Sequence, residues 1–457
     1  METKKKIIIA GAGLVGSLLA IALKKRGHEV LVFEKRSDMR RADYVGGKSI
    51  NLIITAKGMR PLVNLKLWDT VRAITSPVVG RSMHSKTGEE TFQPYGKDPS
   101  ECNYSVSRAD LNRLLMTEAE KTGVHITFNS SLVELDLKTR TAHFENSAPL
   151  SYDLFYGADG TGSATRQALI RALGDQAEYK VEPLGTDYKE LTLPLKNNTW
   201  AMNKDALHIW PRGNHMLMGL PNQDGTFTMT LYMPKDWFEK FNTPAALEEY
   251  FKTNYPDALA LMPDYQAEYQ ANHQGFLGIV RMRPWVYQDQ VALLGDSAHA
   301  MVPFFGQGMN SGFSDVQFLL DQMDQHPNDY RTIFEHYNDV QKLSGDAMAD
   351  MSLENFYEMC DKVGDQHFLL RKKVENKMEQ AFPHKFRSRY GLVTYTLIPY
   401  HLVKEVGVIQ DQVLDDLCQD LKGPDDLDMA RAEKLVDEKI VPWFKARQLS
   451  SERYNLR

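Results

Sequence analysis

A glycine-rich turn between a predicted strand and a predicted helix constrains the fold of this chain more than any other feature. Residues 6–10, Lys-Ile-Ile-Ile-Ala, predict a buried strand, and residues 11–16 follow directly as Gly-Ala-Gly-Leu-Val-Gly. Apolar residues then recur at helical spacing until Gly27. Residues 30–33 predict a second strand, and Glu34 follows it. The order strand, glycine turn, helix, strand and acid is typical of a dinucleotide-binding βαβ unit.

Each position in this unit has a physical purpose. Gly11 and Gly13 allow a tight turn and a close approach of the backbone to a pyrophosphate, and Gly16 allows the helix to pack on the strand. Glu34 is placed to accept hydrogen bonds from ribose hydroxyls and would repel a 2′-phosphate. We therefore expect a Rossmann-like fold that binds FAD or NAD tightly, rather than NADP.

Two further strand-to-helix turns contain glycine. Residues 152–160 end in Gly-Ala-Asp-Gly, which places Asp159 in a turn before a predicted helix. Residues 291–296 read Val-Ala-Leu-Leu-Gly-Asp, a buried strand followed by Gly295 and Asp296. One such turn means little, but three in one chain favour a shared ligand.

The third turn has the features of a flavin site. Asp296 can accept hydrogen bonds from the hydroxyls of a polyol chain. Residues 303–310, Pro-Phe-Phe-Gly-Gln-Gly-Met-Asn, then form a loop that leads into a predicted helix near Met309. The start of a helix favours negative charge, which a reduced flavin carries on its N1/C2 carbonyl edge.

The pattern changes twice along the chain. From about residue 183 to residue 281, apolar and polar residues alternate between turn signals, which predicts an antiparallel sheet. After Asn310 the pattern is mostly helical. The predicted α/β architecture therefore has four parts: residues 1–180 and 281–325 as a FAD-binding domain in two pieces, residues 181–280 as an inserted substrate domain with antiparallel strands, and residues 326–457 as a helical region. Strands near residues 78–100, in the first part, are expected to contact substrate.

Composition excludes several classes of function. A net charge of −6 gives no long-range attraction to nucleic acid. Cys102, Cys360 and Cys418 are far apart, so they predict no disulfide framework and no metal cluster, and a reducing compartment is expected. No apolar stretch reaches the roughly 18 residues that a membrane span requires. We therefore expect a soluble, cytoplasmic protein without a metal.

Together these motifs resemble the single-component flavin-dependent aromatic hydroxylases. Within that class, residues 47–52 (Gly-Lys-Ser-Ile-Asn-Leu), 93–96 (Gln-Pro-Tyr-Gly), 303–310 and 353–359 (Leu-Glu-Asn-Phe-Tyr-Glu-Met) resemble the kynurenine 3-monooxygenase family. The resemblance runs from Lys6 to about Tyr400.

The resemblance implies a reaction and its co-substrates. NADPH would reduce the bound FAD, O2 would add to form a flavin C4a-hydroperoxide, and one oxygen would pass to the ring of L-kynurenine, giving 3-hydroxy-L-kynurenine in tryptophan catabolism and de novo NAD biosynthesis. Because residues 11–16 are the one dinucleotide fingerprint, NADPH is expected to visit a surface groove. The oligomeric state is left open between monomer and homodimer.

The resemblance also assigns residues to the site. Around the reacting atoms it places an apolar loop that would exclude water, made of Pro303, Phe304, Phe305 and Gly306. At the amino-acid end of the substrate it places Arg81 on the carboxylate, with Tyr95, Asn355, Glu358, Met359 and Tyr390 nearby. For FAD it adds to the fingerprint Val15, Arg36, Arg108, Leu132, Asp159, Asp296, Gly308, Met309 and Asn310.

One departure from the family and three alternatives remain. Mitochondrial members of the family carry a hydrophobic C-terminal anchor, whereas residues 447–457 are polar here, so a bacterial-type member is expected. The alternatives are a hydroxylase acting on another aromatic acid, a non-catalytic carrier of the same fold, and an NAD-dependent dehydrogenase. Glu34 and Asp296 argue against the carrier, and the motif at Gly295 is unexplained in the dehydrogenase.

Overall fold

The computed structural model describes residues 3–41, 51–96, 100–361, 366–452 and 454. Most of the stretch at residues 47–52, one of those that carry the family resemblance, falls outside these ranges. Its last two residues, Asn51 and Leu52, begin the strand β3 (Asn51–Ile54).

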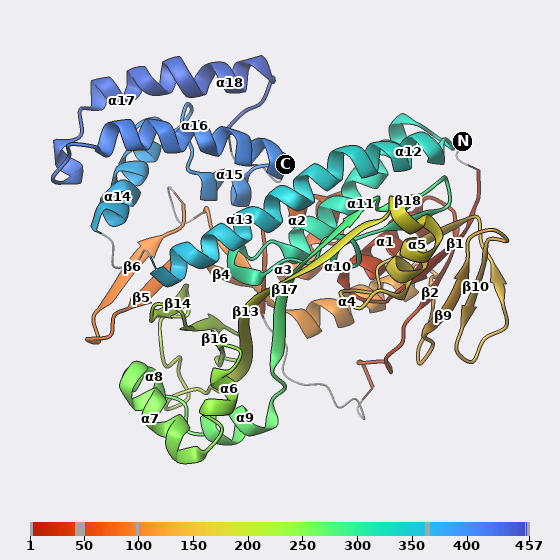
Figure 1. The fold of residues 1–457 in the computed structure, drawn as a ribbon, viewed down its shortest axis with the longest axis horizontal. Helices are drawn as coiled ribbons and strands as arrows, with labels where there is room; N and C mark the ends of the chain where they lie inside the picture. The colour runs from red at the N-terminus through yellow and green to blue at the C-terminus, as the bar shows by residue number, and fades with distance from the viewer. Residues whose placement is uncertain (1–2, 42–50, 97–99, 362–365, 453, 455–457) are drawn as a thin grey trace.

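A six-stranded sheet contains the fingerprint (Figure 1). Its order is β18-β19-β12-β1-β2-β8, and all neighbours are parallel except the β18–β19 pair. The central strand is buried, with Ile7, Ile8 and Ile9 all 0% exposed, because helices cover both faces. The strands are β1 (Lys6–Ala10), β2 (Glu29–Phe33), β8 (His125–Thr127), β12 (Leu154–Gly157), β18 (Val286–Tyr287) and β19 (Val291–Leu293).

Helices from distant parts of the chain pack around this sheet. The fingerprint helix α1 (Leu14–Lys25) lies against α4 (Arg108–Lys121) and α11 (Gly308–Gln325). The other surrounding helices are α2 (Ala56–Asn64), α3 (Trp68–Arg72), α5 (Ala164–Leu173), η1 (Gly174–Gln176), α10 (Asp296–His299), α12 (Tyr330–His336) and the π-helix η3 (Tyr337–Gln341). Contacts between α1 and α11 bring the first and third glycine turns close together.

Two small antiparallel sheets flank the large one. The sheet β11-β10-β9 lies at one end of the molecule, and the sheet β3-β7-β4 connects to α2 and α4. Their remaining strands are β4 (Ser76–Val78), β7 (Asn103–Ser107), β9 (Leu132–Asp136), β10 (Thr141–Phe144) and β11 (Leu150–Ser151).

A seven-stranded sheet forms the second layer, in the order β17-β13-β16-β15-β14-β5-β6. Five of its strands come from the segment with alternating residues: β13 (Glu178–Leu193), β14 (Ala206–Pro211), β15 (Met216–Pro221), β16 (Phe227–Pro234) and β17 (Gly275–Arg283). The other two, β5 (Gly80–His84) and β6 (Glu90–Pro94), come from the first part of the chain and join through a parallel β5–β14 pair. Alternation predicts strands but not their partners, so this junction could not be foreseen.

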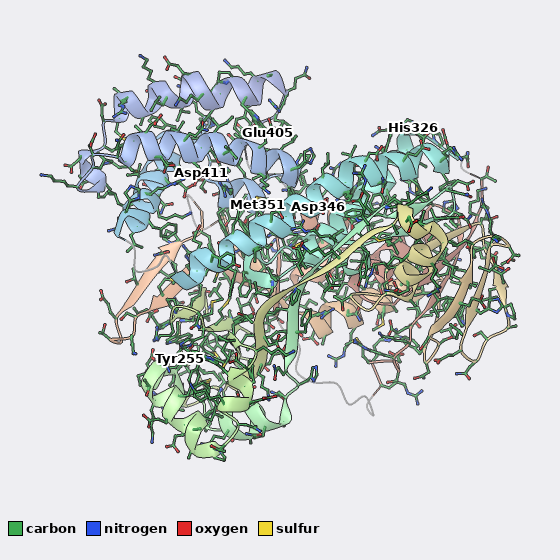
Figure 2. The ribbon with its side chains drawn as sticks, in the orientation of Figure 1. Tyr255, His326, Asp346, Met351, Glu405 and Asp411 are labelled. Atoms are coloured by element: carbon green, nitrogen blue, oxygen red, sulfur yellow. The ribbon has the colours of Figure 1, made fainter. Side chains whose placement is uncertain are left out.

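The two faces of this sheet meet different neighbours. One face packs against four short helices, among which Figure 2 labels Tyr255, and it includes the buried side chains of Trp210 and Phe227. The helices are α6 (Trp237–Lys240), α7 (Pro244–Asn254), α8 (Pro256–Leu259) and α9 (Tyr265–Ala271). The other face, with Met83 and Ile209, packs against Phe304 of the predicted apolar loop.

The C-terminal region is helical, as predicted. The long helix α13 (Lys342–Asp361), on which Figure 2 labels Asp346 and Met351, lies between the sheets and the terminal helices. The remaining elements are α14 (Gln366–Ala381), α15 (Arg389–Tyr395), α16 (Tyr400–Cys418), η5 (Pro424–Asp426), α17 (Met429–Leu435), the π-helix η6 (Val436–Ile440) and α18 (Val441–Ala446). Every helix within the described ranges is too short or too polar to cross a lipid bilayer.

The fold class predicted from the sequence is confirmed: a parallel nucleotide-binding sheet, a largely antiparallel second sheet and a helical C-terminal region. The four residue ranges proposed as domains remain a prediction. One local difference concerns the predicted loop after Gly295, which contains the short helix α10 and the 3₁₀ turn η2 (Pro303–Phe305).

Candidate functional site

The three glycine turns meet at one edge of the parallel sheet. They follow the carboxyl ends of β1, β12 and β19, which are adjacent strands. The backbone N–H of Gly160 donates to Ser297 Oγ at 3.0 Å, and Ser297 Oγ donates to Asp159 Oδ1 at 3.1 Å. This edge is where open α/β sheets bind ligands.

The glycines of the first turn are required for two different reasons. Gly11 has φ +101°, and a Cβ on Gly16 would lie 2.0 Å from the carbonyl oxygen of Gly11. A Cβ on Gly13, by contrast, would meet no heavy atom of the described chain within 4 Å. Gly11 and Gly16 therefore close the turn, whereas Gly13 keeps the space in front of it open.

Glu34 ends β2 beside this turn. Its two carboxylate oxygens accept the backbone N–H groups of Ala12 and Arg36, each at 2.9 Å. A carboxylate has about four lone-pair directions, so capacity remains for two hydroxyl donors. The predicted FAD residue Leu132 begins β9 nearby, because the N–H of Ser130 donates to the carbonyl oxygen of Glu34 at 2.9 Å.

Beneath the third turn lies a buried ion pair. The Asp315 carboxylate, 0% exposed, accepts the backbone N–H of Gly295 at 2.9 Å and lies 2.7 Å from His299 Nε2. Gln341 Nε2 donates to its other oxygen at 3.0 Å. Burial opposes a charge on His299, but the Asp315 carboxylate outweighs it and raises the pKa of the imidazole. The pair fixes Gly295, at φ +57°, so that Asp296 starts α10 at the sheet edge.

Asn310 connects the start of α11 to β3. Its Nδ2 donates to the carbonyl oxygens of Ile53 and Gly306, at 2.7 and 2.9 Å, and its Oδ1 accepts the N–H of Thr55 at 2.8 Å. Gly308 and Met309 form the first turn of this helix, which has no side-chain cap, so its first N–H groups are available to an anion. Arg108 starts α4 at the end of β7, which pairs with β3.

The predicted partners of the substrate's amino-acid end gather at a second place. Tyr95 and Tyr390 stack with ring centroids 5.1 Å apart, and Tyr390 also stacks on Phe305 at 5.7 Å. Burial raises the pKa of Tyr390 to about 12, against the opposing effects of Asn103 and the nearby charge of Arg81. Arg81 Nε donates to Gln93 Oε1 at 2.9 Å. Four elements therefore meet at these two tyrosines: strand β5, the end of β6, helix α15 and turn η2.

The α13 residues reach this place from the other side. Asn355 Nδ2 donates to the carbonyl oxygen of Phe304 at 2.6 Å and lies 3.5 Å from the sulfur of Met359. Glu358 pairs with Lys372 at 3.4 Å. Phe304 packs between the tilted rings of Phe356 and Tyr232, with centroid distances of 4.5 and 5.1 Å, so the loop is held by packing as well as by Asn355.

Four contributors to these arrangements were missed at the level of sequence. They are Asn103, whose Nδ2 donates to the Tyr390 hydroxyl at 2.7 Å, Lys372, Asp315 and Lys57. Lys57 is buried on α2 and donates to the carbonyl oxygens of Val393 and Thr396, at 3.2 and 3.0 Å. Each is a polar residue in no recognisable motif, and only its burial or its partners on other elements distinguish it from a surface residue.

The donors at the sheet edge fit FAD. The space in front of Gly13 and the uncapped start of α1 suit a pyrophosphate, and the carboxylates of Glu34 and Asp296 suit hydroxyl groups. The uncapped start of α11 suits the anionic edge of an isoalloxazine ring. FAD would be held by these groups, and Asn310 would fix the loop that lies over it.

Comparison with known proteins agrees with this assignment. Residues 4–328 match a family model described as FAD binding domain. The chain is 41% identical over 456 residues to the kynurenine 3-monooxygenase of Myxococcus xanthus, covering 97% of each chain. It is 37% identical to that of Flavobacterium johnsoniae, covering 92% of this chain and 95% of the relative. It is 36% identical to that of Dictyostelium discoideum, covering 96% and 97%.

Solved structures share the fold. The tetrameric form of 2-methyl-3-hydroxypyridine-5-carboxylic acid oxygenase superposes with a TM-score of 0.63 at 21% identity, covering 77% of this chain and 91% of that one. The tetracycline destructase Tet(51) superposes with a TM-score of 0.61 at 15% identity, covering 84% and 97%. At such low identity these likenesses establish the architecture alone.

Proposed function

Because the chain belongs to the kynurenine 3-monooxygenase family, we propose that it is an FAD-dependent monooxygenase that converts L-kynurenine and O2 to 3-hydroxy-L-kynurenine with NADPH. The observation that carries the proposal is the 41% identity to a kynurenine 3-monooxygenase over 97% of both chains. When bound, FAD would accept the electrons of NADPH and activate O2. The side chains and backbone of this chain would bind the cofactor and the substrate, orient them and exclude water.

The cofactor residues act by position. Gly11, Gly13 and Gly16 shape the first turn, and Glu34 offers two oxygens to hydroxyls. The segment around Arg36 and Leu132 lies beside Glu34, while Asp159 ties the second turn to the third. The full proposed FAD set is Gly11, Gly13, Val15, Gly16, Glu34, Arg36, Arg108, Leu132, Asp159, Asp296, Gly308, Met309 and Asn310.

The amino-acid end of the substrate would lie at Arg81. Its guanidinium has further donors beyond the Nε–H that bonds Gln93, so it can bind a carboxylate through the others. Tyr95 and Tyr390 stack beside it and present an aromatic wall to an aromatic amino acid. Glu358, which pairs with Lys372, would meet the substrate ammonium group.

The apolar loop would position the ring and exclude water. Phe304 is buried, and its carbonyl oxygen is fixed by Asn355. Phe305 faces Tyr390 in a stacked arrangement, so the loop also borders the proposed carboxylate end. An amino-substituted ring is electron-rich, so orientation by Pro303, Phe304, Phe305, Gly306 and Met359 is the main task.

The wider setting follows from the reaction. Hydroxylation of kynurenine belongs to tryptophan catabolism and de novo NAD biosynthesis. We infer a cytoplasmic location, because three widely spaced cysteines suit a reducing compartment. A monomer or a homodimer would each suffice, since the residues assigned to the site all come from one chain.

The test is NADPH oxidation by the FAD-reconstituted protein in air, with and without L-kynurenine, followed by mass analysis of the product. The expected result is stimulated oxidation and a product heavier by one oxygen atom. Stimulation that yields only hydrogen peroxide would make L-kynurenine an effector and contradict the proposed substrate. Hydroxylation of another aromatic acid, with L-kynurenine inert, would instead support the related hydroxylase.

A further inference from the structure

Two histidines and a glutamate lie side by side on the seven-stranded sheet, away from the proposed catalytic site. Glu90 on β6 is paired directly with His84 on β5, and His208 on β14 is paired with Ser82, two residues before His84. Side chains directly opposite one another, or two residues apart, share a face. His84, Glu90 and His208 therefore project from the same face of three adjacent strands.

This face is the one that packs against the helices α6–α9. Arg81 and Met83 alternate with Ser82 and His84 along β5, so they point to the opposite face, toward Phe304 and the proposed substrate site. The cluster is thus separated from that site by the thickness of the sheet. It is not part of the flavin or substrate machinery.

The three side chains are spaced as metal ligands. One nitrogen of each imidazole and one carboxylate oxygen of Glu90 all lie within 4.8 Å of one another. His84 Nε2 and His208 Nδ1 are 2.8 Å apart. Two nitrogens that bind one tetrahedral Zn²⁺ at about 2.0–2.1 Å are roughly 3.3 Å apart, so a shift of about half an ångström would admit the ion.

The second nitrogen of each ring already faces an acceptor. His208 Nε2 lies 2.8 Å from the carbonyl oxygen of Asn203, which fixes a proton on Nε2 and leaves Nδ1 with a free lone pair. His84 Nδ1 lies 3.6 Å from Asp257 Oδ2, a carboxylate that is also held by Trp210 Nε1 at 2.7 Å. Metal-binding histidines characteristically donate their other N–H to a carbonyl or a carboxylate. His208 already has that partner, whereas His84 Nδ1 would have to close the 3.6 Å gap to Asp257 Oδ2.

From this geometry we propose that His84, His208 and Glu90 bind one Zn²⁺ ion, with Asp257 and the Asn203 carbonyl orienting the two imidazoles. His84 carries its proton on Nε2 in the hydrogen bond to His208. On binding, Nε2 loses that proton to solvent and coordinates the metal, while Nδ1 takes a proton from solvent and donates a hydrogen bond to the Asp257 carboxylate. No proton is released by this change. Three protein ligands leave a fourth tetrahedral position for water.

The surroundings favour a divalent cation. The two imidazoles are buried and the Glu90 carboxylate is exposed, so an ion held by all three would lie at the rim of the sheet. Glu90 and Asp257 bring two negative charges, whereas Arg212, whose Nη1 donates to the His84 carbonyl oxygen at 3.0 Å, brings one positive charge. Trp210 stacks on His84 at 4.0 Å and holds the ring in place.

A bound ion would stabilise the seven-stranded sheet and would take no part in the proposed hydroxylation. It would link β14, β5 and β6, the last of which is the edge strand of the sheet. Strand β5 carries Arg81 on its opposite face, and Tyr95 follows β6 directly. The site would therefore stiffen the strands that present both residues to the proposed substrate.

The experiment uses the FAD-loaded protein after dialysis against a chelator, titrated with ZnCl2 by calorimetry. One ion per chain is expected to bind. Glu90→Gln should weaken the affinity for Zn²⁺ at least tenfold. Asp257→Asn should weaken it by roughly tenfold, as is usual for a residue that orients a metal-binding histidine. Glu89→Gln is the matched control, because Glu89 is an exposed neighbour of Glu90. The affinity of this variant for Zn²⁺ should stay within twofold of that of the wild type.

Glu90 is exposed, so its variant avoids the folding defect that replacement of a buried histidine could cause. Titration with CoCl2 supplies the second measurement, since a four-coordinate site gives intense visible absorption and an adventitious hydrated ion does not. Absence of one-to-one Zn²⁺ binding, equal affinity in the wild type and Glu90→Gln, or a weak six-coordinate cobalt spectrum would each overturn the proposal.

Discussion

The region proposed to bind the cofactor and the region proposed to bind the substrate are built in different ways. The cofactor region is made of backbone: three turns at the ends of β1, β12 and β19, with glycines where a Cβ would collide with the chain or fill the open space. The proposed substrate region is made of side chains from β5, the end of β6, α13 and α15, which meet around η2. Backbone sites depend on short local motifs, whereas side-chain sites depend on how distant segments pack.

The difference has a consequence for substitution. A change at a backbone site should act on cofactor retention or on folding as a whole. A change at a side-chain site should act on one contact and leave the cofactor bound. Bound flavin and steady-state kinetics, measured on the same variants, therefore distinguish the two kinds of site.

Gly13→Ala should abolish FAD retention and leave the fold intact. The added Cβ meets no heavy atom of the described chain within 4 Å, so it enters the space assigned to the pyrophosphate. We expect affinity for FAD to fall by roughly 100-fold or more, as for a group that blocks a close backbone approach. The measurement is bound flavin after gel filtration, with circular dichroism to confirm folding.

Gly423→Ala is the control for that variant, because Gly423 also has ample space but lies in the C-terminal region. It should keep its flavin. If Gly13→Ala also stays fully loaded with FAD, the first turn does not hold the cofactor.

Arg81→Ala should raise the KM for L-kynurenine by about 30-fold and leave bound FAD unchanged. A charge-assisted hydrogen bond to a carboxylate contributes about 2 kcal/mol, which corresponds to that factor. Steady-state kinetics provide KM and kcat, and the flavin absorbance provides the FAD content. Arg331→Ala, at an exposed arginine on α12, is the control and should leave KM unchanged.

Asp315→Asn should weaken FAD binding by roughly tenfold. The buried His299 would lose its anionic partner, and the Gly295 turn would lose a charged acceptor. Fluorescence titration of the apoprotein with FAD measures the change. Asp321→Asn, on the same helix but at a half-buried carboxylate paired with Arg60, should bind FAD as the wild type does. Equal weakening in both variants would assign the effect to the helix rather than to the turn.

Lys57 joins the two regions, and its charge should make stability depend on pH. Burial lowers the pKa of Lys57 from 10.5 to about 7 in the folded protein. Between those values the unfolded chain binds the extra proton, so stability rises with pH by about 1.4 kcal/mol per pH unit. Below about pH 7 both states are charged, and the folded state bears the full cost of burial.

Lys57→Met should remove this dependence. Urea unfolding at several values between pH 7 and pH 10 gives the free energy of unfolding of the wild type and of the variant. In the difference between the two, the contributions of all other titrating groups cancel. The variant's advantage should shrink steadily as pH rises. A constant difference across the range would show that Lys57 keeps an ordinary pKa.

Much of the fold could be predicted because its signals are local. Residues 11–16 and Glu34 predict the parallel sheet, and the alternation after residue 183 predicts the strands of the second sheet. The parallel β5–β14 junction was not predictable, since pairing between distant strands leaves no mark in either segment.

The residues of the candidate site differ in how far they could be predicted from the sequence. The glycines and acids of the three turns follow from physical requirements of the backbone. Arg81, Tyr95, Asn355 and Tyr390 came from family resemblance alone, because a single arginine or tyrosine is usually structural. Asp315, Lys57 and the His84 cluster required the structure, since their burial and partners come from packing.

One measurement tests the central claim that Arg81 receives the carboxylate of L-kynurenine in a side-chain site separate from the cofactor. It compares KM for L-kynurenine and for its methyl ester, in the wild type and in Arg81→Ala, with FAD content recorded for both. The wild type should strongly prefer the acid, and Arg81→Ala should lose this preference while retaining its flavin. A variant that still prefers the acid by the wild-type factor, or that loses its FAD, would show that Arg81 does not receive the carboxylate in a separate site.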